Sequence, residues 1–232
     1  MEKIKLGIQL YTLRDHIQNA EDFDKTLKRL HDMGVRIIQI SGIGPIKPQI
    51  QADIVQKYDM EVCVTHKDFK RMQTDLDAMI DEHKLLACDC MGIGSMPGEA
   101  RESAEAVREF IATATEIGKK MQARGERFCY HNHDFEFVKL GEKYGLDVMY
   151  ETVSADLLAT ELDTCWVNVG GEDPAEYVLK YSGRAPVVHL KDFVMQGKEK
   201  PQKLYALIGI DDDEEQASEE AFSFKPVGSG VQ

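Results

Sequence analysis

Residues 36–93 read RIIQISGIGPIKPQIQADIVQKYDMEVCVTHKDFKRMQTDLDAMIDEHKLLACDCMGI, and short runs rich in β-branched residues alternate in them with longer stretches of helical period. The predicted elements are strand Arg36 to Ile40, helix Pro48 to Tyr58, strand Glu61 to Thr65, helix Leu76 to Lys84 and strand Cys88 to Ile93. Strands that alternate with helices form parallel β-α-β units, because the helix carries the chain back to the starting edge of the sheet. This segment therefore predicts a parallel sheet covered by helices.

The same alternation continues on both sides of this segment. Before it, Lys5 to Tyr11 is a predicted strand, and Ala20 to Met33 is a predicted helix that ends at Gly34. After it come helix Ala100 to Arg124, strand Arg127 to His131, short helix Leu146 to Val153, strand Thr160 to Asp163, helix Asp173 to Tyr181 and strand Pro186 to Leu190. Seven such strands without a glycine-rich phosphate loop favour an α/β fold of the (β/α)8 TIM barrel type over a Rossmann sheet.

The segment after the seventh strand breaks this pattern. Leu204 to Ile210 is followed by an acidic stretch, Asp211 to Glu220, and not by a helix. We interpret residues 195–225 as an inserted hairpin and acidic loop, with Leu204 to Ile210 and Phe222 to Lys225 as its strands; alternatively, one of these two runs supplies strand eight. On the hairpin interpretation, residues 1–232 are a single barrel domain, incomplete at the C-terminus, that lacks its eighth β-α unit. The unpaired edges of such a barrel predict a homo-oligomer.

Composition limits the classes of partner. With 43% apolar residues and seven prolines, the 232 residues are typical of a packed globular protein. The 28 basic and 41 acidic residues give a net charge of −13, which repels nucleic acid backbones and anionic lipid. No run approaches the roughly 18 apolar residues that cross a bilayer, and the first residues lack a signal-peptide core. We expect a cytoplasmic protein with no nucleic acid or membrane partner, and reduced, buried thiols at all five cysteines.

Polar side chains gather at the predicted ends of four strands. In a barrel of this type the loops after the strands carry the active site, so polar residues there are candidates for function. They are the cluster Tyr130 to Phe137 after strand five, Glu161 and Asp163 on strand six, His189 and Lys191 at the end of strand seven, and His66 at the end of strand three. Carboxylates from two strands and an imidazole from a third suit manganese, magnesium, zinc or cobalt. Such an ion polarises the carbonyl and hydroxyl groups of a sugar.

Five residues near this rim are candidates for contact with a sugar or cyclitol substrate. His66 either contacts a substrate hydroxyl or is a rim histidine that neighbouring groups satisfy. Trp166, the only tryptophan, either stacks on a sugar ring or packs on a neighbouring loop. His131 and His133 share a strand face and either contact the substrate or support the metal ligands. Tyr11, at the end of strand one, is the fifth predicted substrate contact.

Lys191 is a candidate acid–base residue. It lies two residues after His189 and therefore on the same strand face. There it is either a catalytic base or the ion-pair partner of a carboxylate such as Asp163 or Glu136. A third interpretation is that Lys191 forms a Schiff base with a keto-sugar.

Several segments, in order along nearly the whole chain, resemble a known family. They are Gly7 to Asp15, Tyr130 to Phe137, Glu161 to Val167, Gly183 with Arg184, His189 to Asp192, and Pro226 to Gly230. Together they resemble the xylose isomerase-like TIM barrels of the sugar phosphate isomerase/epimerase family, which includes inosose dehydratases and keto-sugar epimerases. The resemblance implies that Glu136, Asp163 and His189 bind one divalent metal ion. The glutamate of strand eight that completes the family's site has no counterpart in this sequence.

The function that the resemblance implies is a divalent-metal-dependent isomerase or epimerase acting on a sugar, keto-sugar or sugar phosphate. Removal of a proton next to a carbonyl would give an enediolate, with Glu136, Lys191 and His66 as the expected catalytic residues. An inosose-type dehydratase or other keto-sugar lyase on the same site, and a non-catalytic sugar-binding barrel without the fourth ligand, are the alternatives. A zinc nuclease acting on abasic DNA would need a basic groove, and the net charge of −13 argues against it.

Overall fold

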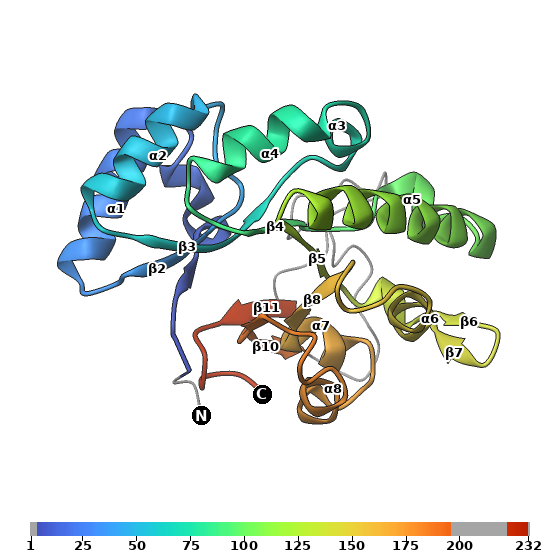
Figure 1. Cartoon of the computed structure of the whole chain (residues 1–232). Coiled ribbons are helices and arrows are strands. Elements are labelled where there is room, and N and C mark those ends of the chain that lie inside the picture. The colour runs from blue at the N-terminus through green and yellow to red at the C-terminus, as the bar shows by residue number, and fades with distance from the viewer. Residues whose placement is uncertain (1–3, 196–221, 232) are drawn as a thin grey trace.

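The computed structural model describes residues 4–195 and 222–231, and its centre is a curled sheet of seven parallel strands (Figure 1). The strands are β1 (Ile8–Gln9), β2 (Ile37–Ile40), β3 (Glu61–His66), β4 (Cys90–Ile93), β5 (Arg127–His131), β8 (Ala159–Asp163) and β9 (Val187–His189). Each pairs with the next in parallel, in the order β1-β2-β3-β4-β5-β8-β9. The predicted α/β barrel of parallel strands is confirmed, and within the described residues the sheet has no eighth strand, so β1 and β9 are its edges.

Helices cover the outside of this curled sheet (Figure 1). They are α1 (Ala20–Asp32), α2 (Pro48–Lys57), α3 (Phe69–Thr74), α4 (Leu76–Lys84), α5 (Ala104–Ala123), α6 (Gly145–Thr152), α7 (Thr164–Val169) and α8 (Pro174–Lys180), with 3-10 turns η1 (Leu10–His16), η2 (Gly98–Arg101) and η3 (Phe135–Phe137). Local chemistry sets their starts: the Asn19 side chain accepts the Asp22 N–H at α1, and the Ser103 hydroxyl accepts the Ala106 N–H at α5. The cap at Ser103 is why α5 begins later than the predicted Ala100.

Two large apolar clusters form the core. One packs β4, β5 and β8 against α3 to α8, and the other packs β2 and β3 against η1, α1 and α2. In the second cluster Cys90 on β4 and Cys129 on β5 form a disulfide, although they are separated by 39 positions in the sequence. The prediction of five reduced thiols is therefore wrong for this pair, because the parallel register of two core strands brings their side chains together. Cys63, Cys88 and Cys165 are free thiols, as predicted.

The first strand is shorter than predicted. We expected a strand over Lys5 to Tyr11, but β1 has only Ile8 and Gln9, and η1 follows it directly. The Gln9 side chain accepts the Tyr11 N–H and so caps η1, which ends the extended conformation. A short strand at the edge of the sheet leaves Leu6 79% exposed.

A small antiparallel hairpin follows β9 in the described residues. Its strands are β10 (Asp192–Met195) and β11 (Phe222–Lys225), and a second hairpin pairs β6 (Lys139–Leu140) with β7 (Lys143–Tyr144). The Asp192 carboxylate accepts the N–H groups of Gly228 and Gly230 at 2.9 and 2.8 Å, which fixes the chain after β11. Phe222 to Lys225 is thus a hairpin strand, but its partner is β10; the predicted partner, Leu204 to Ile210, and the acidic stretch Asp211 to Glu220 lie outside the described residues.

Within residues 4–195 and 222–231, no helix is both long enough and apolar enough to cross a membrane.

Candidate metal centre and active site

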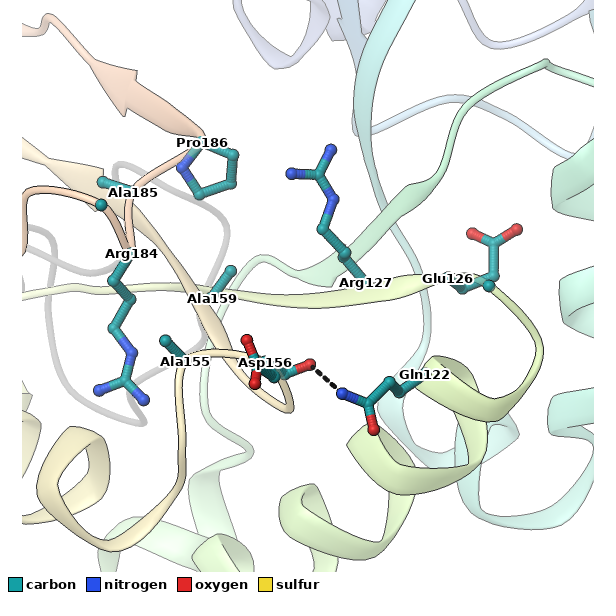
Figure 2. Close-up of a pocket in the computed structure, with 11 residues that line it drawn as sticks. Gln122, Glu126, Arg127, Ala155, Asp156, Ala159, Arg184, Ala185 and Pro186 are labelled. Carbon is teal, nitrogen blue, oxygen red and sulfur yellow. Dashed lines mark hydrogen bonds between the residues drawn. The ribbon is translucent and has the colours of Figure 1, made fainter.

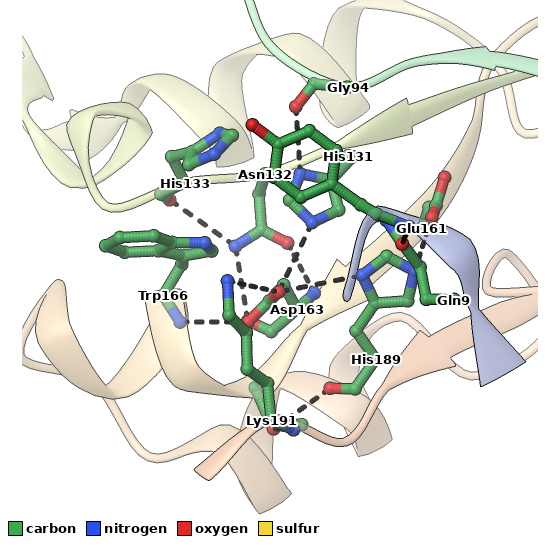
Figure 3. Close-up of polar contacts among 12 residues, drawn as sticks. Gln9, Gly94, His131, Asn132, His133, Glu161, Asp163, Trp166, His189 and Lys191 are labelled. Carbon is green, nitrogen blue, oxygen red and sulfur yellow. Dashed lines mark hydrogen bonds and ion pairs between the residues drawn. The ribbon is translucent and has the colours of Figure 1, made fainter. Parts of the chain in front are cut away.

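Three side chains from three neighbouring strands meet at the carboxyl end of the sheet (Figure 3). His131 ends β5, Asp163 ends β8 and His189 ends β9. Their potential ligand atoms all lie within 4.8 Å of one another. The Asp163 Oδ2 atom is 3.3 Å from His131 Nε2 and 3.6 Å from His189 Nδ1. The strand ends thus supply two imidazole nitrogens and one carboxylate oxygen to one small volume.

The far nitrogen of each imidazole is held by oxygen atoms that can only accept a hydrogen bond. His131 Nδ1 donates to the Gly94 carbonyl oxygen at 3.1 Å; His189 Nε2 donates to Gln39 Oε1 at 2.7 Å and forms an ion pair with Glu161 Oε1 at 2.5 Å. The other nitrogen of each ring faces Asp163 Oδ2, and it offers a lone pair to a metal ion once its proton is lost. Metal-binding histidines are usually held in this way by an acceptor on the far nitrogen.

The donor set of His131, Asp163 and His189 fits a divalent transition metal. Imidazole nitrogens and a carboxylate oxygen are ligands of zinc, manganese and cobalt, and three protein ligands leave room for water or substrate. All three side chains are at least 89% buried, so the groups are desolvated before any ligand arrives.

Electrostatics in this cluster are strongly coupled. Burial alone would lower the pKa of His189, but the charges of Glu161 and Asp163 outweigh it and raise that pKa to about 9. Burial lowers the pKa of His131, against the opposing effect of Asp163. For Asp163, burial would raise the pKa, yet Lys191 and the imidazoles hold it well below its usual range. The carboxylate is therefore ionised and available to a cation at neutral pH.

Glu136, the predicted ligand from strand five, is not a member of the three-residue cluster. Its Oε1 atom accepts the Tyr130 hydroxyl, and its Oε2 atom accepts the His133 N–H at 2.8 Å. Burial raises the pKa of Glu136 to about 7, although these hydrogen bonds oppose the shift. The side chain that β5 contributes to the cluster is His131, which the sequence suggested as a substrate contact or a supporting residue.

A second polar layer lies beneath the cluster and is centred on Glu161. This fully buried carboxylate contacts His66 Nε2 at 2.8 Å, His189 Nε2 at 2.5 Å and Gln39 Nε2 at 2.6 Å. His66 also contacts the Ser41 hydroxyl at 3.0 Å through Nδ1, so both of its nitrogens have partners. Burial would raise the pKa of Glu161, but the charges of His66 and His189 hold it well below its usual range. Of the two interpretations of His66, these contacts agree with a histidine satisfied by its neighbours.

Lys191 lies beside the cluster, and 28% of its side chain is accessible to solvent. Its Nζ atom is 3.8 Å from Asp163 Oδ2, the ion pair that we considered as one alternative. The same atom lies 4.8 Å from the centre of the Trp166 ring and 4.2 Å from that of Phe224. These are contacts of a charged ammonium with a carboxylate and two aromatic faces.

Trp166 is fully buried rather than presented to a ligand. It stacks on Phe222, with ring centres 6.3 Å apart, and meets Phe224 edge-on. Asp163 caps α7 by accepting the Trp166 N–H, which places the indole beneath the hairpin β10–β11. Packing on a neighbouring loop, our second interpretation of Trp166, is what the structure contains.

The two other predicted substrate contacts, His133 and Tyr11, differ in burial: His133 is buried and Tyr11 is half-buried. His133 is buried between the rings of Phe135 and Trp166, and its Nδ1 atom has no hydrogen-bond partner. Burial lowers the pKa of His133 well below its usual value, so the ring is neutral. Tyr11 is half-buried in η1, with the Arg14 guanidinium 4.7 Å above its ring.

Sequence reasoning missed three residues that build this region. Gln39 on β2 bridges Glu161 and His189, Asn132 accepts the Asp163 N–H at 2.8 Å, and Phe224 covers Lys191. Gln39 carried a signal, because a glutamine inside an apolar strand needs a buried partner. Asn132 carried a weaker signal as a part of the polar cluster after β5. Phe224 carried none, because it reaches the site through a hairpin.

A cavity lies at the opposite end of the strands. It has a volume of about 520 Å³ and is lined by residues at the amino ends of β5 and β8 and by the loop before β9, including Arg127, Asp156, Ala159 and Pro186 (Figure 2). The amino ends of barrel strands contribute to stability, whereas the loops at the carboxyl ends carry the active site. The polar cluster of Figure 3 is therefore the candidate active site, and the cavity is not.

No protein-family model matches this chain, and no curated protein sequence matches it significantly. Solved structures do match it. A sugar phosphate isomerase/epimerase from Parabacteroides distasonis superposes with a TM-score of 0.69 at 20% identity, over 90% of this chain and 82% of that one. A probable 3-DHS dehydratase, AsbF, from Bacillus anthracis gives 0.70 at 9% identity, over 98% and 85%. A xylose isomerase domain protein from Planctomyces limnophilus gives 0.59 at 13% identity, over 83% and 75%. The chain therefore has the fold of the xylose isomerase-like TIM barrels, and the resemblance found in the sequence is confirmed at the level of the fold.

Proposed function

We propose that this protein is a divalent-metal-dependent isomerase or epimerase that acts on a sugar, keto-sugar or sugar phosphate through an enediolate. The observation that supports this most directly is the meeting of His131, Asp163 and His189 at the carboxyl ends of three strands, with both imidazoles held from behind. The proteins of similar fold whose names include isomerase, epimerase and dehydratase support the same reaction class.

In this proposal His131, Asp163 and His189 hold the metal ion. When bound, the ion would stabilise the negative charge that develops on the substrate oxygen as the neighbouring carbon loses its proton. Glu161 keeps His189 oriented through Nε2, and Gln39 fixes Glu161 in turn. This chain of buried hydrogen bonds keeps the ligand atoms in place before the substrate binds.

Lys191 is the proposed acid–base residue. Its Nζ atom lies 3.8 Å from Asp163 and is the accessible proton-handling group beside the cluster. The rings of Phe224 and Trp166 pack against the lysine on one side. A lysine in this place can exchange a proton with a carbon or hydroxyl of a sugar held at the cluster.

The same first step would serve an inosose-type dehydratase or another keto-sugar lyase. The enediolate is reprotonated in an isomerase or epimerase, whereas in a dehydratase it expels a hydroxyl from the next carbon. A barrel without a fourth ligand could instead bind a sugar without turning it over. An assay of the shared first step separates these possibilities better than an assay of any one product.

The experiment is deuterium incorporation from D₂O into a panel of keto-sugars, sugar phosphates and inososes, followed by NMR. The protein is first treated with a chelator and then supplied with Mn²⁺, Mg²⁺, Zn²⁺ or Co²⁺. We expect exchange at a carbon next to the carbonyl that requires added metal and is lost in Asp163→Asn. An absence of exchange with every metal and substrate would overturn the proposed enzyme, and a sugar-dependent change in metal affinity without exchange would indicate the non-catalytic barrel.

A further inference from the structure

The Glu136 carboxylate joins two parts of the segment that carries His131. One oxygen accepts the hydroxyl of Tyr130, the residue before His131, and the other accepts the N–H of His133, two residues after it, at 2.8 Å. Glu136 is 3% exposed and Tyr130 is fully buried. Both carboxylate oxygens therefore have donors inside the protein.

The direction of the Tyr130 side chain shows on which side of the sheet this contact lies. Its ring packs against Phe110 of α5, with ring centres 5.7 Å apart, and so lies between the sheet and the helices. His131, the next residue on the strand, points to the opposite face, where Asp163 and His189 lie. Glu136 is thus bonded on the helix side of β5, and His131 is presented on the other side.

We infer that Glu136 is a positioning residue for His131 and His133, and not a metal ligand. Its carboxylate closes the turn at η3 and holds the loop after β5 at one point, and Asn132 holds it at a second by accepting the Asp163 N–H at 2.8 Å. With the hydrogen bonds of Glu136 and Asn132 both formed, the end of β5 has one conformation, and His131 Nε2 stays beside Asp163. This inference rests on the proposed function, because it concerns how the ligand from β5 is held.

Replacing Glu136 by glutamine separates the two roles. An amide can make both contacts: its oxygen accepts the His133 N–H, and its NH₂ group donates to the Tyr130 oxygen. An amide oxygen is, however, a much weaker ligand for a transition metal than a carboxylate. Glu136→Gln therefore preserves positioning and removes ligation, whereas Glu136→Ala removes both.

The test compares wild type, Glu136→Gln, Glu136→Ala and a ligand control, Asp163→Asn, by calorimetric titration with Co²⁺ at pH 7.5. We expect Glu136→Gln to bind Co²⁺ within about threefold of wild type and Glu136→Ala to bind it about 10 to 100 times more weakly, as expected for the loss of a group that orients a ligand. Asp163→Asn should lose binding. In parallel, the His133 amide should stay protected from hydrogen exchange in Glu136→Gln and lose its protection in Glu136→Ala.

Two results would overturn the inference. One is a Glu136→Gln variant that loses as much Co²⁺ affinity as Glu136→Ala, which would make the carboxylate a ligand. The other is unchanged protection of the His133 amide in Glu136→Ala. A wild-type protein that binds no Co²⁺ would count against the proposed function instead, and the exchange of the His133 amide would still decide whether Glu136 holds the loop. Tyr130→Phe, which removes one donor and keeps the carboxylate, should give an intermediate loss of protection.

Discussion

Glu136→Gln should change how the stability of the protein depends on pH. The folded protein raises the pKa of Glu136 from 4.5 to about 7, chiefly because the carboxyl group is buried. The folded state therefore holds this proton more tightly than the unfolded state does. The resulting stability is fully present below about pH 4.5 and is lost as the pH rises through 7. A glutamine side chain is uncharged at every pH, like the protonated acid, so the Glu136→Gln variant keeps this contribution to stability as the pH rises.

The magnitude follows from the size of the shift. A difference of one pKa unit corresponds to about 1.4 kcal/mol, so a shift from 4.5 to about 7 corresponds to about 3 kcal/mol. The free energy of unfolding of Glu136→Gln relative to wild type should rise by about that amount between pH 4.5 and pH 8. Other titrating groups are common to both proteins and cancel in the difference, since their surroundings are unchanged.

Urea denaturation of both proteins in chelator-containing buffers, at half-unit intervals from pH 4.5 to 8.5, measures this difference. The two stability curves should coincide below about pH 4.5, separate progressively between pH 4.5 and 7, and run parallel above pH 7. Curves that stay parallel over the whole range would refute the reasoning, because the Glu136 carboxyl group would then titrate alike in the folded and unfolded states. Tyr130→Phe serves as a control that disturbs the same contact without changing the number of acids.

Three further outcomes are expected. Asp163→Asn should abolish Co²⁺ binding. Asp163→Ala should also abolish it and should lower the free energy of unfolding by about 3–5 kcal/mol, measured by equilibrium unfolding, because His189 and Lys191 then lack the buried carboxylate between them. Lys191→Met should bind Co²⁺ as wild type does and lower the rate of deuterium incorporation at least about 100-fold, and an unchanged rate would exclude the lysine as the acid–base residue. The open edges of the sheet at β1 and β9 should make the protein a dimer or larger oligomer at micromolar concentration, as measured by analytical ultracentrifugation. Leu6 and Leu190 near these edges are 79% and 61% exposed, and replacing both with lysine should shift the protein toward the monomer. A stable wild-type monomer would contradict that expectation.

Most of the fold could be predicted because each strand and helix has its own period. α4 and β5 agree with the predicted bounds at both ends, and most other elements agree within a few residues. The errors arise where a side chain, and not a period, sets the boundary. Gln9 ends β1 early by capping η1, and Asp163 starts the unpredicted α7 by accepting the Trp166 N–H.

The candidate site was predictable in place but not in detail. Strand ends located Asp163 and His189, because every parallel strand delivers its last residues to the same rim. The choice between His131 and Glu136 depends on the fold of a short loop, in which Glu136 turns back to Tyr130 and His133. No pattern of local spacing encodes that turn. The aromatic cover of Lys191 comes from Phe224, which is separated from the lysine by more than thirty positions and is brought to it by the pairing of β10 with β11.

The position of β9 at the edge of the sheet has a mechanical consequence. This three-residue strand pairs within the described part of the sheet only with β8, and yet it carries His189 and leads directly into Lys191. Edge strands held on one side open at low cost, so half of the candidate site is attached to a strand that can open locally. A cation bound by His131, Asp163 and His189 would cross-link β9 to β5 and β8. Metal binding would then stabilise the closed position of β9, and local opening of β9 would release the metal, so the two equilibria are coupled.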